Sequence, residues 1–156
     1  MVSLELATLE DAEILKLISM DAFSPDFEQY GSYPPGIESL TWHASEVEKG
    51  HYYKIVNNDK VAGGMLAVPA HDSDIEIKYF FIAKEFQNRQ IGSTAMHLIE
   101  AKYPSMTVWN LVTPSKAYRN HHFYEKLGYL KIGESQLDLN KEFKFFEYQK
   151  TKQSNG

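Results

Sequence analysis

The chain has 156 residues, of which 43% are hydrophobic and 24% charged, as is usual for a globular protein with one hydrophobic core. It contains no cysteine, which excludes disulfides, thiolate nucleophiles and thiolate zinc sites. The net charge of −5 argues against general nucleic-acid binding, because contacts with phosphates need a basic surface.

No hydrophobic run approaches the roughly 18 residues of a membrane span, and the N-terminal sequence MVSLELATLED is acidic, unlike a signal peptide. We therefore expect a cytoplasmic protein without membrane contacts. Residues 1–50 hold ten acidic and two basic side chains. A solvated, glutamate-rich helix surface explains this asymmetry at least as well as an acidic binding surface.

The first half of the chain is predicted to contain three strands and two helices. A short strand from Leu4 precedes an amphipathic helix that Thr8 can cap, and a second helix over residues 37–49 ends at Gly50. Residues 23–36 are rich in aromatic residues, proline and glycine, have no strong periodicity and are expected to form a loop. Residues 51–69 are typical of two strands joined by a turn at 57–59.

The second half is predicted to alternate strands and helices. A strand over 74–82 leads into a helix that Pro104 stops, and a strand over 106–112 leads into a helix that ends at Gly128. Two strand-like segments, 128–135 and 142–149, follow. This order predicts an α+β, three-layer fold: a mixed, mostly antiparallel central sheet with helices on both faces. We expect a single domain over residues 1–150 and a flexible tail over 151–156.

The segment after the 74–82 strand is a candidate phosphate site. It passes through a short loop into a helix N-terminus, where unpaired N–H groups and the helix dipole favour an anion. Gly92 permits close approach of the backbone, and Ser93 and Thr94 add hydroxyl groups. An ordinary helix start remains the alternative. The segment lacks the GxxxxGK[ST] and GxGxxG patterns, so neither ATP nor dinucleotide binding is supported.

Two motifs in this region and beyond it resemble those of a known family. QNRQIG, from Gln87 to Gly92, is similar to the QxxGxG signature of the GNAT N-acetyltransferase superfamily, and FYEKLGY, from Phe123 to Tyr129, is similar to its second signature. The order of elements resembles the family fold from about Leu4 to Tyr148. The resemblance implies an N-acetyltransferase that moves an acetyl group from acetyl-CoA to a primary amine of a small molecule or peptide, by direct attack in a ternary complex.

The resemblance also implies which residues contact acetyl-CoA. Backbone N–H groups near Phe81 and Ile82 would polarise the thioester carbonyl, and the loop and helix start would hold the pyrophosphate. The expected cofactor-binding residues are Phe81, Ile82, Gln87, Asn88, Arg89, Gln90, Ile91, Gly92, Ser93, Thr94, Asn120 and Phe123. Two positions depart from the family pattern. Gln90 replaces the first glycine of the signature, and Ala117 replaces a frequent asparagine, with Asn120 one helical turn before Tyr124.

Tyr124 and Glu76 are the predicted catalytic residues. The resemblance assigns the thiolate leaving group to Tyr124. For an unperturbed phenol and thiol, full proton transfer is uphill by about 2 kcal/mol, so a strong hydrogen bond to sulfur is equally plausible. Glu76 matches the position of a general base in some family members, whereas others use ordered water. The alternatives are an aromatic residue packed under the sheet and an exposed or salt-bridged carboxylate.

The acceptor amine is the open question. In the family it binds at the first helices and their loop, which here carry Tyr30, Tyr33 and much acidic charge, so we expect a cationic amine. The main rival hypothesis is a catalytically silent acyl-CoA sensor or scaffold with the same fold. Family habit suggests a homodimer. No metal is expected, because the adjacent His121 and His122 point about 100° apart on a helix and would not bind one ion together.

Overall fold

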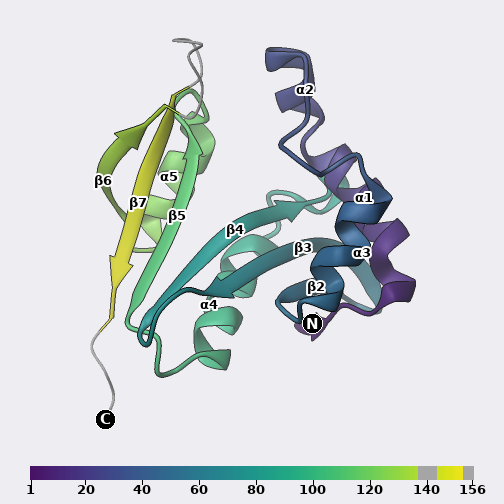
Figure 1. Ribbon diagram of the computed structural model, residues 1–156, viewed down its shortest axis with the longest axis horizontal. Coiled ribbons are helices and arrows are strands. Elements are labelled where there is room, and N and C mark those ends of the chain that lie inside the picture. The colour runs from purple at the N-terminus through teal and green to yellow at the C-terminus, as the bar shows by residue number, and fades with distance from the viewer. Residues whose placement is uncertain (137–143, 153–156) are drawn as a thin grey trace. The chain divides into compact units, whose positions relative to one another are not determined.

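The computed structural model describes residues 1–136 and 144–152, and its seven strands form one sheet in the order β1-β2-β3-β4-β5-β7-β6 (Figure 1). The neighbours β1–β2, β2–β3, β5–β7 and β6–β7 are antiparallel, whereas β4 and β5 are parallel. The predicted α+β fold with a mixed, mostly antiparallel sheet is confirmed.

The chain divides into two compact units. Unit 1 comprises Met1–Ala67 and Tyr79–Lys102, and unit 2 comprises Val68–Lys78 together with the described residues from Tyr103 onward. The division falls within β3 (Lys60–Pro69) and β4 (Asp74–Ile82), so both units contribute to the sheet. The prediction of a single domain over residues 1–150 stays a prediction. Residue 151 belongs to a strand, and residues 153–156 of the expected tail lie outside the described part of the chain.

Unit 1 places helices on both faces of its part of the sheet (Figure 1). Its other strands are β1 (Val2–Leu6) and β2 (Tyr52–Asn57), and its α-helices are α1 (Ala12–Ala22), α2 (Ser24–Tyr30), α3 (Leu40–Glu48) and α4 (Ile91–Lys102). Two short 3₁₀ helices, η1 (Leu9–Asp11) and η2 (Lys84–Phe86), precede α1 and α4. The helix α4 packs against β1, whereas α1 packs against α3.

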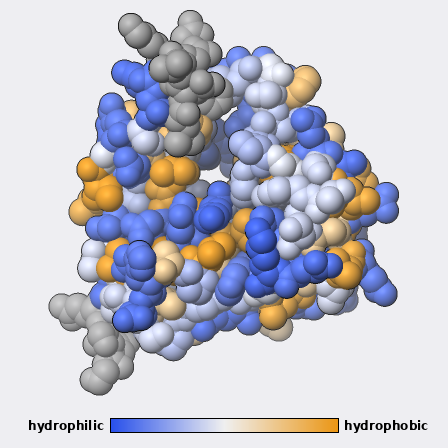
Figure 2. Space-filling model, in the orientation of Figure 1, coloured by the Kyte–Doolittle hydropathy of each residue, from blue (hydrophilic) through white to orange (hydrophobic). Residues whose placement is uncertain are grey.

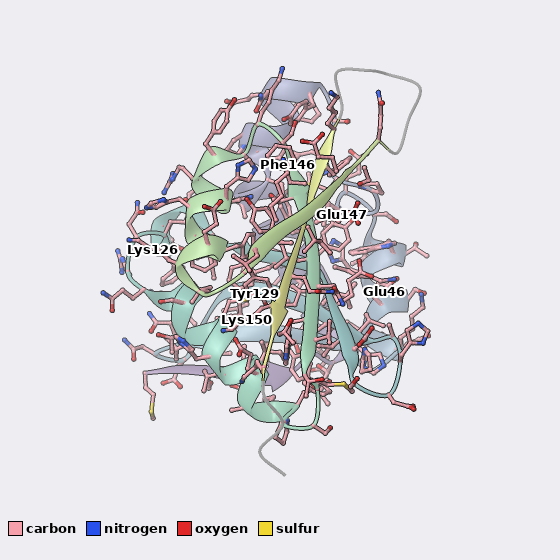
Figure 3. The ribbon with its side chains drawn as sticks, turned by 90° about the vertical axis from the view of Figure 1, so that its left-hand side faces the viewer. Glu46, Lys126, Tyr129, Phe146, Glu147 and Lys150 are labelled. Carbon is pink, nitrogen blue, oxygen red and sulfur yellow. The ribbon has the colours of Figure 1, made fainter. Side chains whose placement is uncertain are left out.

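Unit 2 packs one helix against its strands. It contains β5 (Val108–Pro114), α5 (Tyr118–Lys126), β6 (Leu130–Ser135) and β7 (Phe145–Thr151). The ring of His121 on α5 stacks on Phe146, with ring centroids 4.8 Å apart, and the Tyr124 ring contacts Tyr148. Alternation along β7 therefore turns Phe146 and Tyr148 toward α5 and Glu147 and Gln149 to the other side. The side chains of Phe146 and Glu147 are labelled in Figure 3.

One prediction for unit 1 is wrong. Residues 23–36 were expected to form an irregular loop, but Ser24–Tyr30 is the helix α2. Pro25 in its first turn loses no hydrogen bond, because the first N–H groups of a helix have no intrahelical partner. Gly31, with φ of 80°, ends the helix in the left-handed conformation that glycine favours. At seven residues α2 is too short to show a clear periodicity, and its helix-start and helix-stop residues were the better signal.

The surface shows no dominant apolar area on the face drawn in Figure 2, where hydrophobic side chains lie in small groups among hydrophilic ones. Individual exposed residues include Leu130 and Ile132 on β6, which are 71% and 57% exposed. Single exposed hydrophobic residues are normal on protein surfaces.

Among the described residues, no helix combines the length and the apolar character needed to cross a membrane.

Candidate active site

The loop between β4 and α4 has an unusual backbone. Asn88 and Gln90 adopt positive φ angles of 64° and 63°, a left-handed region that asparagine tolerates but that costs glutamine roughly 1–2 kcal/mol. Such strain persists where the surrounding structure imposes it, and it is concentrated at ligand-binding sites. Alternation of left- and right-handed residues turns successive N–H groups toward one point and makes a concave anion site. The predicted phosphate loop therefore has a backbone suited to an anion.

The hydroxyl groups near this loop already have hydrogen-bond acceptors, whereas backbone N–H groups at the start of α4 do not. The hydroxyl groups of Ser93 and Thr94 donate to the carbonyl oxygen of Gln90 at 3.1 and 2.9 Å, and the Thr94 N–H donates to the same oxygen at 3.1 Å. The hydroxyl protons, which the sequence suggested as ligand contacts, are thus used within the first turn of α4. The N–H groups of Ile91, Gly92 and Ser93 have no carbonyl one turn earlier in the helix, so they point out of its N-terminus.

Gln87 and Arg89 point their side chains at the protein. Nε2 of Gln87 donates a 2.9 Å hydrogen bond to the carbonyl oxygen of Ile82, the last residue of β4. The guanidinium carbon of Arg89 lies 5.8 Å from the centre of the Phe86 ring. Gln87 thus links the loop to the end of β4, and Arg89 keeps its charge beside the loop.

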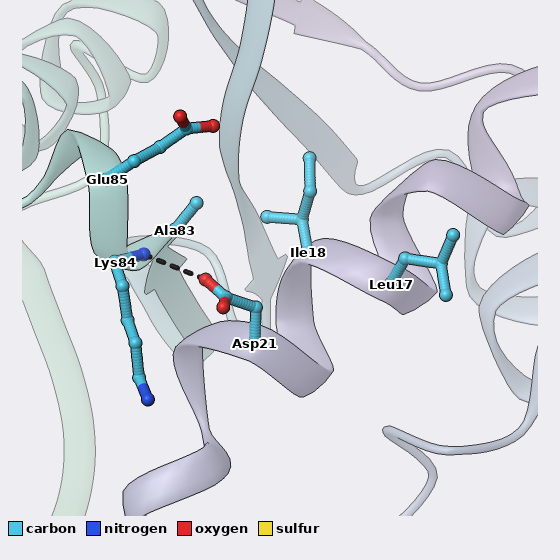
Figure 4. Close-up of a pocket in the computed structure, with 6 residues that line it drawn as sticks. All are labelled: Leu17, Ile18, Asp21, Ala83, Lys84 and Glu85. Carbon is cyan, nitrogen blue, oxygen red and sulfur yellow. Dashed lines mark hydrogen bonds between the residues drawn. The ribbon is translucent and has the colours of Figure 1, made fainter.

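A pocket lies between α1 and the segment that follows β4 (Figure 4). Its volume is about 370 Å³, and it is lined by Leu17, Ile18, Asp21, Ala83, Lys84 and Glu85. Oδ2 of Asp21 accepts a 2.9 Å hydrogen bond from the backbone N–H of Lys84. The sequence analysis missed Asp21, because an acidic residue near the end of a helix has no distinguishing pattern. The contact fixes α1 to the start of η2.

The predicted acceptor residues lie on α2 and in the segment that follows it. Tyr30 is the last residue of α2, and the ring of Tyr33 packs on Phe27 with centroids 4.8 Å apart. Phe23, the residue before α2, makes further aromatic contacts. Phe23 contacts Tyr79 and Phe81, and the Tyr79 hydroxyl donates to the carbonyl of Pro35 at 2.6 Å. Burial raises the pKa of Tyr79 to about 12, so its phenol stays neutral at physiological pH.

Tyr124, the predicted leaving-group residue, lies in the buried face of α5 in unit 2. It is 8% exposed, and its ring contacts those of Phe123, Tyr129 and Tyr148. Burial raises the pKa of Tyr124 well above its ordinary value of 10. Its hydroxyl therefore stays protonated at neutral pH and can donate a hydrogen bond, but complete proton transfer to a thiolate is more costly than about 2 kcal/mol. Within the described residues, no hydrogen bond engages this hydroxyl.

The neighbours of Tyr124 on α5 have separate roles. Nδ2 of Asn120 donates to Oγ1 of Thr113 at 3.2 Å, which ties the first turn of α5 to β5. Nε2 of the buried His121 donates to the carbonyl of Pro114 at 2.9 Å, whereas His122 is exposed. The His121 nitrogen is therefore already used in packing the helix. In the described parts of the chain, no three His, Asp or Glu side chains are grouped to hold a metal ion.

Glu76, the predicted base, lies on β4 in unit 2 beside a pair of amide side chains. It is half-buried, and it pairs in register with Asn110 on β5, which in turn pairs with Gln149 on β7. Nε2 of Gln149 donates to Oδ1 of Asn110 at 3.0 Å, which leaves the Asn110 N–H groups for other acceptors. The described residues provide no hydrogen bond or ion pair to the Glu76 carboxylate.

The opposite edge of unit 2 is held by aromatic and lysine side chains. Nζ of Lys131 lies 3.6 Å from the centre of the Phe146 ring, and Nζ of Lys150 lies 5.9 Å from that of Tyr129. Figure 3 shows Lys150 next to Tyr129. The Lys150 side chain also covers Gly128, whose φ of 97° ends the α5 segment as predicted. The contacts of Lys150 thus support the end of the FYEKLGY segment, at Gly128 and Tyr129.

The sequence profile of the acetyltransferase (GNAT) family matches residues 14–129, which include both motifs. The chain belongs to this family. A curated relative, the uncharacterised protein YrkN of Bacillus subtilis (strain 168), is 29% identical over 73 residues, which are 47% of this chain and only 40% of that protein. Its name assigns no activity, so the family membership rests on the profile match.

Solved structures share the fold of this GNAT protein over almost its whole length. An acetyltransferase of the GNAT family from Streptococcus agalactiae 2603 superposes with a TM-score of 0.81 and 17% identity, covering 97% of this chain and 96% of that one. The PaiA N-acetyltransferase of Thermoplasma acidophilum, solved with coenzyme A, gives 0.78, 15% identity, and 97% and 99% coverage. The ribosomal-protein-S18-alanine N-acetyltransferase of Escherichia coli gives 0.78, 12% identity, and 100% and 97% coverage. At these identities the likeness shows the fold alone.

Proposed function

We propose that this GNAT protein is an N-acetyltransferase, which transfers an acetyl group from acetyl-CoA to a primary amine by direct attack in a ternary complex. The observation that carries the proposal is the strained backbone at Asn88 and Gln90, which leads directly into the N-terminus of α4. The left-handed conformation is unfavourable for Gln90, and a backbone of this kind can aim N–H groups at an anion. The pyrophosphate of acetyl-CoA is such an anion, and one of the structural neighbours was solved with coenzyme A.

The chain's own groups would supply the remaining chemistry. The thioester offers an activated acetyl group, and an N–H at the end of β4 would stabilise the negative charge that develops on its oxygen. Glu76, or a water molecule that it holds, would accept the proton of the incoming ammonium, so that the neutral amine forms the new C–N bond. When the C–S bond breaks, the nitrogen loses its second proton and the thiolate takes one up through solvent, while the Tyr124 hydroxyl would donate a hydrogen bond to the departing sulfur. Its raised pKa favours this over complete transfer of the proton.

For the acceptor we propose a cationic amine, either a small molecule or a peptide. Support comes from the excess of acidic side chains in residues 1–50 and from the aromatic residues around α2, which suit a cation. Tyr30 and Tyr33 are the proposed contacts. We also propose cytoplasmic location, a single domain, no metal requirement and a homodimer, each of which follows from the family resemblance or the sequence.

The rival proposal is an acyl-CoA sensor that binds but does not react. It draws support from Gln90, whose side chain replaces a glycine of the family signature, and from the deep burial of the Tyr124 ring. Calorimetric titration with acetyl-CoA, followed by measurement of thiol release with a panel of amines, separates the two. Binding with amine-dependent thiol release supports the enzyme, and binding without release from any amine supports the sensor. Absence of binding contradicts both.

A further inference from the structure

Two consecutive glycines of β3, Gly63 and Gly64, lie against the last residues of β4. A Cβ atom on Gly63 would overlap the carbonyl oxygen of Phe81 and lie 3.1 Å from the Cα atom of Ile82. A Cβ atom on Gly64 would instead overlap the Phe81 ring. The strand approaches its neighbour so closely at these residues that no side chain fits. The two glycines differ, because one makes room for backbone and the other for a side chain.

The space beside Gly63 fixes the direction of one peptide group. The described chain contains no cis peptide bond, so the carbonyl of Phe81 and the N–H of Ile82 point in opposite directions from one plane. Because the carbonyl oxygen occupies the place of a Gly63 side chain, the Ile82 N–H points away from Gly63. It is one of the two N–H groups that the family resemblance associates with the thioester oxygen.

The residues that follow this peptide group are held by three hydrogen bonds within unit 1. The carbonyl of Ile82 accepts from Nε2 of Gln87 at 2.9 Å, and the N–H of Ala83 donates to the carbonyl of Ala62 at 2.8 Å. The N–H of Lys84 donates to Oδ2 of Asp21. These hydrogen bonds fix the chain after the Phe81–Ile82 peptide group. The orientation of that peptide group therefore depends on the free space at Gly63.

We propose that Gly63 is a positioning residue for acetyl transfer, because its missing side chain admits the Phe81 carbonyl and thereby aims the Ile82 N–H at the thioester oxygen. This rests on the proposed function and adds a residue that the family motifs do not contain. A methyl group at residue 63 would push the carbonyl back and rotate the peptide. The N–H would then miss the oxygen, although the phosphate loop would be unchanged.

The direct test uses the whole chain labelled with ¹⁵N and records the Ile82 amide by NMR in three states: free, with CoA and with acetyl-CoA. CoA lacks the thioester, so a hydrogen bond to the acetyl oxygen moves the Ile82 amide proton downfield with acetyl-CoA only. A response to acetyl-CoA no larger than that to CoA would overturn the inference. If the chain bound neither ligand, the proposed function itself would have failed, and the two failures are thus distinguishable.

Variants test the role of Gly63 itself. Gly63→Ala is expected to lower kcat by about 100-fold, the loss typical of one oxyanion donor, and to keep the affinity for CoA. Gly64→Ala meets the far end of the Phe81 side chain and not the Phe81 carbonyl oxygen, so it should lower stability with a smaller loss of kcat. Gly133→Ala on β6 is the matched control, because its Cβ would meet only the flexible end of Glu147, at 3.3 Å. Equal losses of kcat for residues 63 and 64 would contradict the proposal. If Gly63→Ala does not fold, equal shifts of the Ile82 amide with CoA and with acetyl-CoA in the natural chain still overturn the proposal.

Discussion

Nε2 of Gln87 donates a 2.9 Å hydrogen bond to the carbonyl oxygen of Ile82, which joins the first residue of the family signature to the end of β4. Replacing Gln87 by glutamate or leucine removes this donor. We expect each variant to lose about 1 kcal/mol of unfolding free energy and to have a lower kcat, because the Ile82 peptide is less firmly held. Urea unfolding and steady-state kinetics check this. An unchanged kcat in both variants would leave Gln87 with a structural role only.

Replacing Gln90 by glycine should make the folded protein more stable. The exposed side chain at φ of 63° costs roughly 1–2 kcal/mol, whereas the greater freedom of glycine in the unfolded chain costs about 0.5–1 kcal/mol. Gln90→Gly is therefore expected to raise the unfolding free energy by about 0.5–1 kcal/mol and to preserve or improve acetyl-CoA affinity. Gln90→Ala is the control, because it removes the side chain but keeps the strain. If Gln90→Ala gains as much unfolding free energy as Gln90→Gly, the positive φ of residue 90 is not the cause of the gain.

Removal of the Tyr124 hydroxyl should affect catalysis more than folding. Because no described residue bonds this hydroxyl, Tyr124→Phe is expected to change stability by less than about 1 kcal/mol while lowering kcat about 100-fold. Tyr148→Phe is the matched control in the same aromatic layer. It loses a 2.9 Å hydrogen bond to Oε2 of Glu125, so it should lose stability and keep kcat. The reverse pattern would show that Tyr124 only packs under the sheet.

Glu76→Gln should lower the rate mainly at pH values below the pKa of the acceptor amine. There the amine arrives protonated and a base must remove its proton, whereas at higher pH the amine is already neutral. The measurement is the pH dependence of kcat/KM for the natural chain and the variant. The Asn57→Ala change, in a strand of unit 1 remote in sequence, serves as a control for general damage. If kcat/KM depends on pH in the same way in the natural chain and in Glu76→Gln, a chain of water molecules removes the proton and Glu76 does not.

The buried ring of His43 should make the unfolding free energy fall at acid pH. Its ring is fully buried, with Nε2 donating to the carbonyl of Ile37 at 2.8 Å and Nδ1 accepting from the Tyr52 hydroxyl at 2.9 Å. Burial lowers the pKa of His43 below its ordinary 6.5, a shift to which the charge of Lys16 adds and which the hydrogen bond to Ile37 opposes. The unfolded chain therefore binds the proton more strongly, so the unfolding free energy falls as pH drops below about 6.5.

Urea unfolding at pH 7.5 and 5.5 tests this, with His97→Gln on the exposed side of α4 as control. His43→Gln should have a lower stability at pH 7.5 but a smaller difference between the two pH values. If the unfolding free energy falls by the same amount between pH 7.5 and 5.5 in His43→Gln and in the natural chain, groups other than His43 cause the acid sensitivity.

The sequence predicted the elements that carry strong local patterns. The strand Asp74–Ile82 has the predicted bounds, and the helix that begins after Gln90 and the FYEKLGY segment were placed correctly because their periodicity and end signals agree. The short helix α2 was missed because seven residues hold too little periodic signal. Its first-turn proline and its final glycine were present in the sequence and would have indicated it.

Other features of the site depend on contacts between distant residues, which no local pattern encodes. The positive φ of Gln90 was not predicted, because glutamine disfavours it. The hydrogen bond from Lys84 to Asp21 joins residues 63 apart in sequence. The close approach of Gly63 to Phe81 requires knowledge of strand register, although two adjacent glycines within a strand were a visible hint.

Acetyl-CoA-dependent thiol release, measured with a panel of cationic, neutral and anionic amines, tests the central claim most directly. The account predicts release that depends on an amine, is fastest with cationic amines and falls about 100-fold in Tyr124→Phe. Fastest release with neutral or anionic amines would remove the proposed cationic acceptor. Tight binding of acetyl-CoA without release from any amine would contradict the proposed acetyltransferase activity.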